Sequence, residues 1–147
     1  MKLSKNFSPL LAGLALTTAL MVSPALAEVV KFSATLDSAQ EVPPTDSAGK
    51  GTLNASYDTD SKKLDWTLEY SELTGDATGA HFHGPAGTGE NADVAIPIPD
   101  AKSGSKGSAT LTDEQAKDLM DGKYYVNVHT AKYADGEIRG QVEKTAQ

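Results

Sequence analysis

Apolar and polar residues alternate with a period of two over residues 30–36, 51–57 and 64–70 of this chain. This alternation is typical of β-strands that bury one face, whereas the buried stripe of a helix repeats every three to four residues. The turn-forming segment Asp58-Thr59-Asp60-Ser61 separates the last two stretches, which predicts a β-hairpin. The pattern therefore restricts the chain to a fold built mainly from short antiparallel strands.

The second half of the chain has the same character. Further short strands are expected over residues 80–83, 109–111, 124–130 and 138–142. Residues 94–99 also alternate, but two prolines place them at a sheet edge, because proline lacks the N–H that a strand ladder needs. Residues 103–108 are expected to form a turn.

One helix is expected after residue 112. Thr112 can cap its N-terminus, and Gln115, three residues later, completes a capping box. Gly122 is a typical residue just beyond a helix C-terminus. Together with seven or eight short strands, this helix predicts an all-β fold, an antiparallel Greek-key β-sandwich with one short helix.

The first 27 residues have the organisation of a cleavable export signal. Lys2 and Lys5 precede an uncharged apolar run over residues 10–22, and Ala25-Leu26-Ala27 provides a cleavage site. As a helix this run rises about 20 Å, less than the ~30 Å hydrocarbon core of a membrane. We expect residues 1–27 to be removed and residues 28–147 to form one periplasmic or secreted domain without a membrane anchor.

The composition excludes several classes of protein. The chain contains no cysteine, which excludes disulfides, thiolate metal sites and thiol nucleophiles. Its net charge is −7, and loss of the two leader lysines makes it more negative. Nucleic-acid binding is not expected, because that affinity depends on Lys and Arg neutralising phosphates. Whether the protein forms a homo-oligomer is left open.

All three histidines of the chain lie in two short segments. His81 and His83 are two residues apart on one expected strand, so both side chains leave the same face, while Phe82 turns to the core. His129 lies on another expected strand, next to the core candidate Val128. If the two strands approach each other, three imidazoles converge. The alternative is that the histidines are ordinary exposed polar residues.

Three converging imidazoles would form a metal site that needs no thiol. Imidazole binds copper and zinc as the neutral base. A structural zinc ion usually takes four protein ligands, whereas three histidines leave one position open, which favours copper and keeps zinc as the second choice. The candidates for a further ligand are Asp93, Glu90, Glu137 and water.

The outward position of His129 conflicts with a tight turn at Asp135-Gly136. A two-residue turn would pair His129 with Val142, whose side chain is expected in the core. His129 faces outward only if the connection is longer or contains a bulge. We expect such a departure from regular pairing, which is common beside active sites.

Three stretches of the sequence resemble the CHRD domain, the module named from chordin that also occurs in exported bacterial proteins. They are LDSAQEVPP (36–44), GAHFHGPAG (79–87) and YYVNVHTAKYADGEIRGQV (124–142). The resemblance covers essentially residues 29–142 and implies an immunoglobulin-like or superoxide-dismutase-like sandwich.

A second likeness is to the copper site of copper–zinc superoxide dismutases. A His-x-His pair on one strand, a further His on a late strand and a nearby Arg are similar to that copper-ligand arrangement. The bridging histidine, the zinc ligands and the disulfide of that family have no counterpart here. The likeness therefore implies a copper-only form.

These likenesses lead us to expect a copper-dependent superoxide dismutase in which His81, His83 and His129 hold the metal. Arg139 is the candidate catalytic residue that guides the superoxide anion, because its guanidinium stays charged. The alternative for Arg139 is a surface cross-strand pair with Glu137 or another acid. Two other functions remain open, a non-catalytic periplasmic copper-binding or sequestration protein and an extracellular protein-interaction module without a metal.

Other reaction classes find little support. The sequence contains neither a Gly-x-Ser-x-Gly elbow nor a GxxxxGK[ST] phosphate loop. Glu41 and Asp46 lie close together in a turn-rich segment, where we expect both to be solvated loop acids.

Overall fold

The computed structural model of the protein describes residues 27–146. Nearly all of the predicted export signal, residues 1–27, lies outside the described residues, so its removal and the location that it implies stay predictions. Across residues 27–146, no helix is long and apolar enough to cross a membrane.

The described part of the chain forms mainly β-strands, as the alternation predicts. The strands are β1 (Val29–Asp37), β2 (Lys50–Asp58), β3 (Lys63–Ser71), β4 (Ala77–His83), β5 (Val94–Pro97), β6 (Ser105–Thr110), β7 (Tyr125–Thr130), β8 (Ile138–Gln141) and β9 (Glu143–Lys144). The helical segments are α1 (Asp113–Met120) and the 3-10 turn η1 (Ser38–Gln40). The prediction of an all-β chain with one short α-helix is confirmed.

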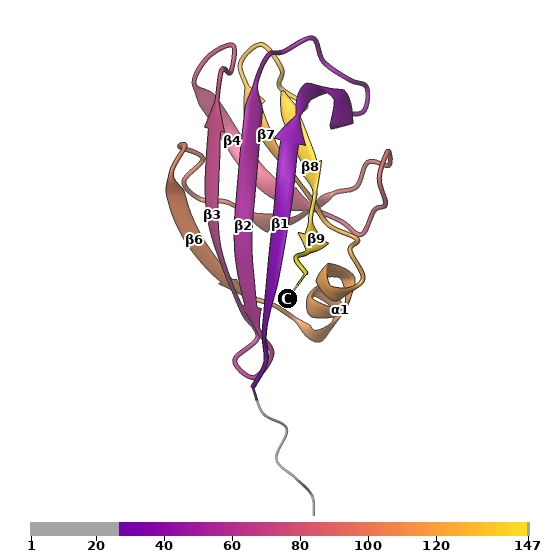
Figure 1. Ribbon diagram of the computed structural model, residues 1–147. Helices are drawn as coiled ribbons and strands as arrows, with labels where there is room; N and C mark the ends of the chain where they lie inside the picture. Colours follow the sequence, from indigo (N-terminus) through magenta and orange to yellow (C-terminus); the bar gives the residue numbers. More distant parts are fainter. Residues whose placement is uncertain (1–26, 147) are drawn as a thin grey trace, which may run out of the picture.

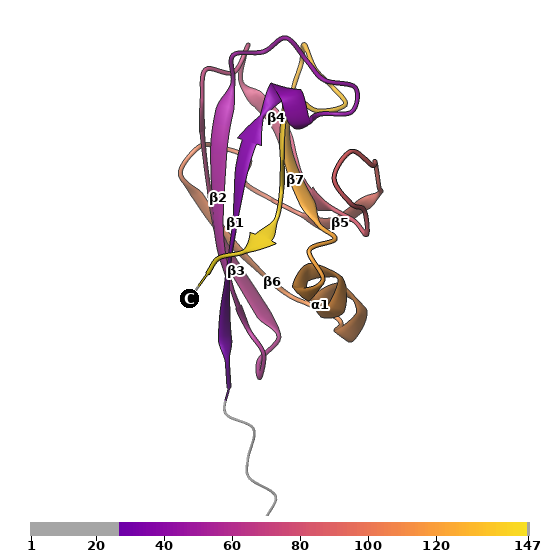
Figure 2. The same ribbon diagram turned by 45° about the vertical axis from the view of Figure 1, so that its right-hand side comes forward.

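These strands belong to one antiparallel sheet with the order β5-β4-β7-β8-β1-β2-β3-β6, and β9 pairs with β1. β1, β2 and β3 pair along their whole lengths, whereas β1 and β8 share only the pair Asp37 and Arg139. At this narrow link the sheet folds over, so that β1, β2 and β3 form one layer and β4 and β7 lie in the other (Figure 1, Figure 2). The result is a nearly closed, barrel-like sheet.

The expected sandwich of two sheets is corrected in one respect. Because β8 and β9 both pair with β1, the two layers are halves of one continuous sheet rather than two separate sheets. β5 and β6 are its two ends, which confirms that the proline-containing segment 94–97 is an edge strand.

The hydrophobic core fills the space between the two layers. Inward-facing residues are buried at alternate positions along β1, β2 and β3. Trp66 from β3 meets Phe82 from β4 edge to face, with ring centroids 5.2 Å apart. Because Phe82 points into this core, His81 and His83 on either side of it point outward.

The capping residues of α1 behave as predicted. Thr112 Oγ1 accepts a hydrogen bond from the Gln115 N–H at 3.2 Å, and Gln115 Oε1 accepts one from the Thr112 N–H at 3.0 Å. Gly122 follows the helix with a φ of 71°, a left-handed conformation that favours glycine. The capping box and the glycine terminus are both confirmed.

The turn predicted for residues 103–108 is confined to Ser103 and Gly104, and the strand predicted for residues 109–111 begins earlier, at Ser105. Ser105–Thr110 forms β6, which pairs with β3. Gly107 in this strand lies opposite Trp66, whose ring occupies the space beside it. A Cβ at Gly107 would lie 2.5 Å from Cζ2 of Trp66, so apolar alternation is missing where it would have marked the strand.

The connection between β7 and β8 is longer than a two-residue turn. β7 ends at Thr130, β8 begins at Ile138, and Val128 pairs with Ile138. In this register His129 does not face Val142. The expected departure from a tight hairpin is therefore confirmed, and it leaves His129 on the outer face.

Candidate metal centre

The strands that carry the histidines are direct neighbours in the sheet. β4 and β7 pair so that His81 lies opposite Asn127 and Gly79 lies opposite His129. His81 and His129 are therefore diagonal neighbours on the outer face. Gly79 gives them room, because a Cβ there would lie 3.3 Å from Cε1 of His81.

The three imidazoles meet on this face. One ring nitrogen of each histidine lies within 4.8 Å of the others. His81 Nδ1 is 3.1 Å from His129 Nε2, and the His83 ring centroid lies 5.6 Å from that of His81. Across residues 27–146, no carboxylate joins the cluster. The arrangement can hold a metal ion, whose identity the geometry does not specify.

Backbone carbonyls fix the orientation of two of the rings. The Nδ1 of His129 lies 2.9 Å from the carbonyl oxygen of Ala134, and the Nδ1 of His83 lies 3.0 Å from that of Ala92. A carbonyl only accepts, so each Nδ1 carries the proton and each Nε2 presents a lone pair. This is the usual second-sphere arrangement of metal-binding histidines.

Burial favours the neutral form of His81 and of His83. Desolvation lowers the pKa of His81, and the neighbouring His129 and His83 lower it further. Desolvation also lowers the pKa of His83, although its bond to Ala92 opposes the shift. Since a metal ion binds the neutral base, the cluster is set up for coordination near neutral pH.

With this geometry in place, comparison with known protein families matches residues 32–142 to the CHRD domain. The chain belongs to the CHRD family. No curated protein matches the chain, and no solved structure matches it. The resemblance of the three sequence stretches to this family is thereby confirmed, whereas the likeness to superoxide dismutases finds no support in these comparisons.

In this CHRD domain, the loop between β4 and β5 covers part of the outer face. Its Ala92 carbonyl holds His83, and the backbone of Ala92 also bonds to the hydroxyl of Tyr125 at 3.2 and 3.3 Å. The ring of Tyr125 stacks on His83, with centroids 4.9 Å apart and planes inclined by 2°. Tyr125 therefore fixes both the loop and the His83 ring.

Arg139 lies within this arrangement rather than on the open surface. Its side chain is 2% exposed, and its guanidinium carbon lies 3.4 Å from the centre of the Tyr125 ring. It donates to Asn91 Oδ1 at 3.0 Å and to the Glu90 carbonyl. These contacts attach the loop between β4 and β5 to β8. The expected role of Arg139 in guiding an anion stays a prediction. The alternative surface pair with Glu137 is wrong, because both residues are buried and neither contacts the other.

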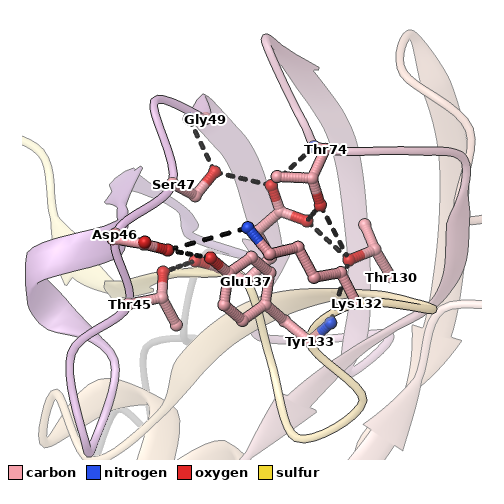
Figure 3. A network of polar contacts seen from close by, with 9 residues as sticks. All are labelled: Thr45, Asp46, Ser47, Gly49, Thr74, Thr130, Lys132, Tyr133 and Glu137. Carbon is pink, nitrogen blue, oxygen red and sulfur yellow. Dashed lines mark hydrogen bonds and ion pairs between the residues drawn. The ribbon is translucent and has the colours of Figure 1, made fainter.

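Glu137 is engaged in a separate buried network (Figure 3). Its carboxylate accepts from Ser47 Oγ at 2.5 Å, from Thr130 Oγ1 at 2.5 Å, and from both the N–H and the hydroxyl of Thr74. Burial alone would raise the pKa of Glu137, but these hydrogen bonds lower it overall. Glu137 therefore ties together three segments at one end of the CHRD domain instead of reaching the histidines.

Glu41 corrects a second expectation. It is buried, with 6% of its surface exposed, whereas Asp46 is exposed as expected. Burial raises the pKa of Glu41 to about 7, even though Arg139 acts to lower it. The 3-10 turn and the two prolines after it fold this segment back against the β7–β8 connection, which the local sequence did not indicate.

Sequence reasoning about the centre missed the stacking of Tyr125 on His83 and the burial of Glu41. The position of Tyr125 could have been found, because it alternates with core residues on the strand that carries His129 and so shares its face. Glu41 could not, since its burial depends on a contact with a distant loop.

Proposed function

We propose that this CHRD domain binds one copper ion through His81, His83 and His129. The observation that carries the proposal is the convergence of three imidazole nitrogens within 4.8 Å. The carbonyls of Ala92 and Ala134 support it, because they leave lone pairs on Nε2 of His83 and His129.

Copper fits this donor set better than zinc does. The chain has no cysteine, and across residues 27–146 no carboxylate joins the imidazoles. Structural zinc sites usually use four protein ligands, often with thiolates. A neutral, nitrogen-rich set without thiolates suits copper, and zinc is the second choice.

We propose further that the copper-loaded protein is a superoxide dismutase that uses copper without zinc. Its fold would then belong to the immunoglobulin-like or dismutase-like sandwiches that the family resemblance implies. Copper bound by imidazoles supplies a one-electron couple suited to converting two superoxide anions and two protons into dioxygen and hydrogen peroxide. His81 and His129 are only half-buried, so a small anion can reach their side of the cluster. Arg139, with Lys132, is the candidate source of positive charge.

Copper storage or delivery without turnover is the second candidate function. Two observations favour it over catalysis. Arg139 is 2% exposed and already donates to the covering loop, and the chain carries a net charge of −7, which repels an anion. Either function fits an exported, periplasmic or secreted protein that binds no nucleic acid.

A superoxide assay on copper-loaded protein tests the proposal, with an equal concentration of free copper as the control. Dismutation above the free-copper rate that disappears in the double variant H81A/H129A supports the enzyme. Binding of copper that depends on the same histidines, with no added dismutation, supports storage or delivery. If the double variant binds copper as tightly as the wild type, the site is wrong.

A further inference from the structure

Three of the five buried side-chain polar atoms that lack a hydrogen-bond partner among the described residues lie at or beside the metal centre; the other two are Trp66 Nε1 and Ser105 Oγ. In the part of the chain that the structure describes, Glu41 Oε1, His83 Nε2 and Asn127 Oδ1 are buried and have no hydrogen-bond partner. The three residues are 6%, 9% and 3% exposed. A buried polar atom without a partner is costly, so such a group of atoms marks a place where a ligand completes the bonding.

The orientation of the Asn127 amide decides which atoms face the histidines. Its Nδ2 lies 3.4 Å from the carbonyl oxygen of Asp135. A Cβ at Gly136 would lie 2.7 Å from that Nδ2 and 2.4 Å from Glu41 Oε1. The amide nitrogen and the carboxylate oxygen therefore both lie beside this glycine. Nδ2 therefore points toward the β7–β8 connection and Glu41, and Oδ1 points the other way.

On that other side, Asn127 stands between the histidines. It lies opposite His81 across the β4–β7 pair and two residues before His129 on β7. Asn127 is also a diagonal neighbour of His83, because His83 lies opposite Tyr125, two residues before Asn127 on β7. Because Nδ1 of His83 bonds to Ala92, its Nε2 presents a lone pair, and this nitrogen is buried without a partner like Asn127 Oδ1.

Two buried lone pairs on neighbouring residues, neither of which has a donor, are both satisfied when a cation binds to them. We propose that Asn127 Oδ1 is the fourth protein donor of the metal centre, next to the three imidazole nitrogens, and that Glu41 is a positioning residue that holds the amide in this orientation. The inference rests on the proposed metal-binding function and names the ligand that the histidines leave open.

Glu41 acts at a distance from the metal, through Nδ2 of Asn127. The carboxylate beside Nδ2 favours the amide nitrogen at this position, and the carbonyl oxygen of Asp135, 3.4 Å from Nδ2, acts in the same direction. Gly136, with a φ of 132°, is needed for the same reason, since any side chain there would displace the carboxylate.

Four variants separate these roles. N127L removes the oxygen at similar size, N127D keeps an oxygen, E41L removes the acceptor beside Nδ2, and E41Q keeps one. N54L, at an exposed asparagine on β2, is the matched control. The probes are Cu(II) and Zn(II), each bound in competition with a chelator, and the Cu(II) electron paramagnetic resonance spectrum reports the donor set.

The affinity of N127L for both metals is expected to fall about tenfold or more, with a changed copper spectrum, while N127D stays close to the wild type. E41L should weaken binding and E41Q should restore it. Unchanged affinity and spectrum in a folded N127L, with binding that still depends on the histidines, overturn this inference and leave the proposed function standing.

The wild-type protein gives a readout that does not depend on any variant folding. Zinc coordination through the carboxamide oxygen should shift the Cγ resonance of Asn127 far more than those of Asn54 and Asn91. A Cγ resonance that does not move while the imidazole resonances do would overturn the inference. If the wild-type protein binds neither metal, the inference and the proposed function both fail.

Discussion

The guanidinium of Arg139 lies 3.4 Å from the centre of the Tyr125 ring, which places a cation from β8 against an aromatic side chain of β7. Tyr125 in turn stacks on His83 of β4. Three strands that are neighbours in the sheet thus contribute one layered stack. The position of the candidate metal ligand His83 therefore depends on Arg139, which acts on it through Tyr125.

Replacing Arg139 with lysine should loosen this stack. Lysine keeps the charge but has no planar guanidinium to lie on Tyr125 and to donate to both Asn91 and the Glu90 carbonyl. We expect R139K to lower the free energy of unfolding by about 2 kcal/mol and to weaken copper binding several-fold. Urea unfolding and a copper competition assay measure the two effects. Unfolding and affinity equal to the wild type would show that the stack is dispensable.

Glu137→Gln should destabilise the protein at neutral pH by about 2 kcal/mol or more, because an amide cannot replace a buried carboxylate that accepts four hydrogen bonds. E143Q, on the exposed strand β9, is the matched control.

The pH dependence of this effect follows from the lowered pKa of Glu137. A carboxyl group whose pKa is lower in the folded state stabilises the fold above its ordinary pKa and loses this contribution as the pH falls through the folded value. The difference between wild type and E137Q should therefore shrink in acid. Urea unfolding at pH 7 and at pH 3.5 checks it, and a difference that grows in acid would contradict the assigned network.

The contribution of Glu41 to stability should have the opposite pH dependence to that of Glu137. Its pKa is about 7 in the folded state and 4.5 in the ordinary state, so the folded protein binds the extra proton between these values. Stability that comes from this group is present below pH 4.5 and is lost as the pH rises to 7. In metal-free protein, E41Q should gain on the order of 2 kcal/mol over the wild type between pH 4.5 and pH 8. Parallel stability curves for the two proteins would show that Glu41 is not buried in solution.

Local sequence patterns predicted most of the fold because they act over short distances. The alternation around Phe32 and Leu53, the capping box at Thr112 and the glycine terminus of α1 are each settled by neighbouring residues. The first residues of β6 could not be predicted from the local pattern, because Gly107 leaves room there for Trp66, a requirement that comes from another strand.

In the candidate site, too, features that depend on neighbouring residues could be predicted, and features that depend on distant segments could not. The convergence of His81, His83 and His129 could be predicted, since strand periodicity places them on one face. The burial of Arg139 could not, because it depends on a loop that folds over the sheet from residues 84–93. Continuity of the two layers through β8 and β9 is likewise a matter of pairing between segments far apart in the sequence.

Acid should release the metal, because protonated imidazoles cannot bind it. The pKa values of His81 and His83 are lowered, so both stay neutral to a lower pH than an ordinary histidine, whose pKa is 6.5. We expect bound copper to be retained at pH 6.5 and to be lost at more acidic pH, as protons displace it. A pH titration of the copper spectrum measures the midpoint, and a midpoint above 6.5 would contradict the neutral cluster.

The central claim is most directly tested by the stoichiometry and affinity of Cu(II) binding, measured against a chelator of known affinity. The wild-type protein and the control N54L should bind one Cu(II) per chain with the same affinity, and the triple variant H81A/H83A/H129A should bind at least about a hundredfold more weakly. Equal affinity in the triple variant, or no binding by the wild-type protein, would contradict a metal centre at these three histidines.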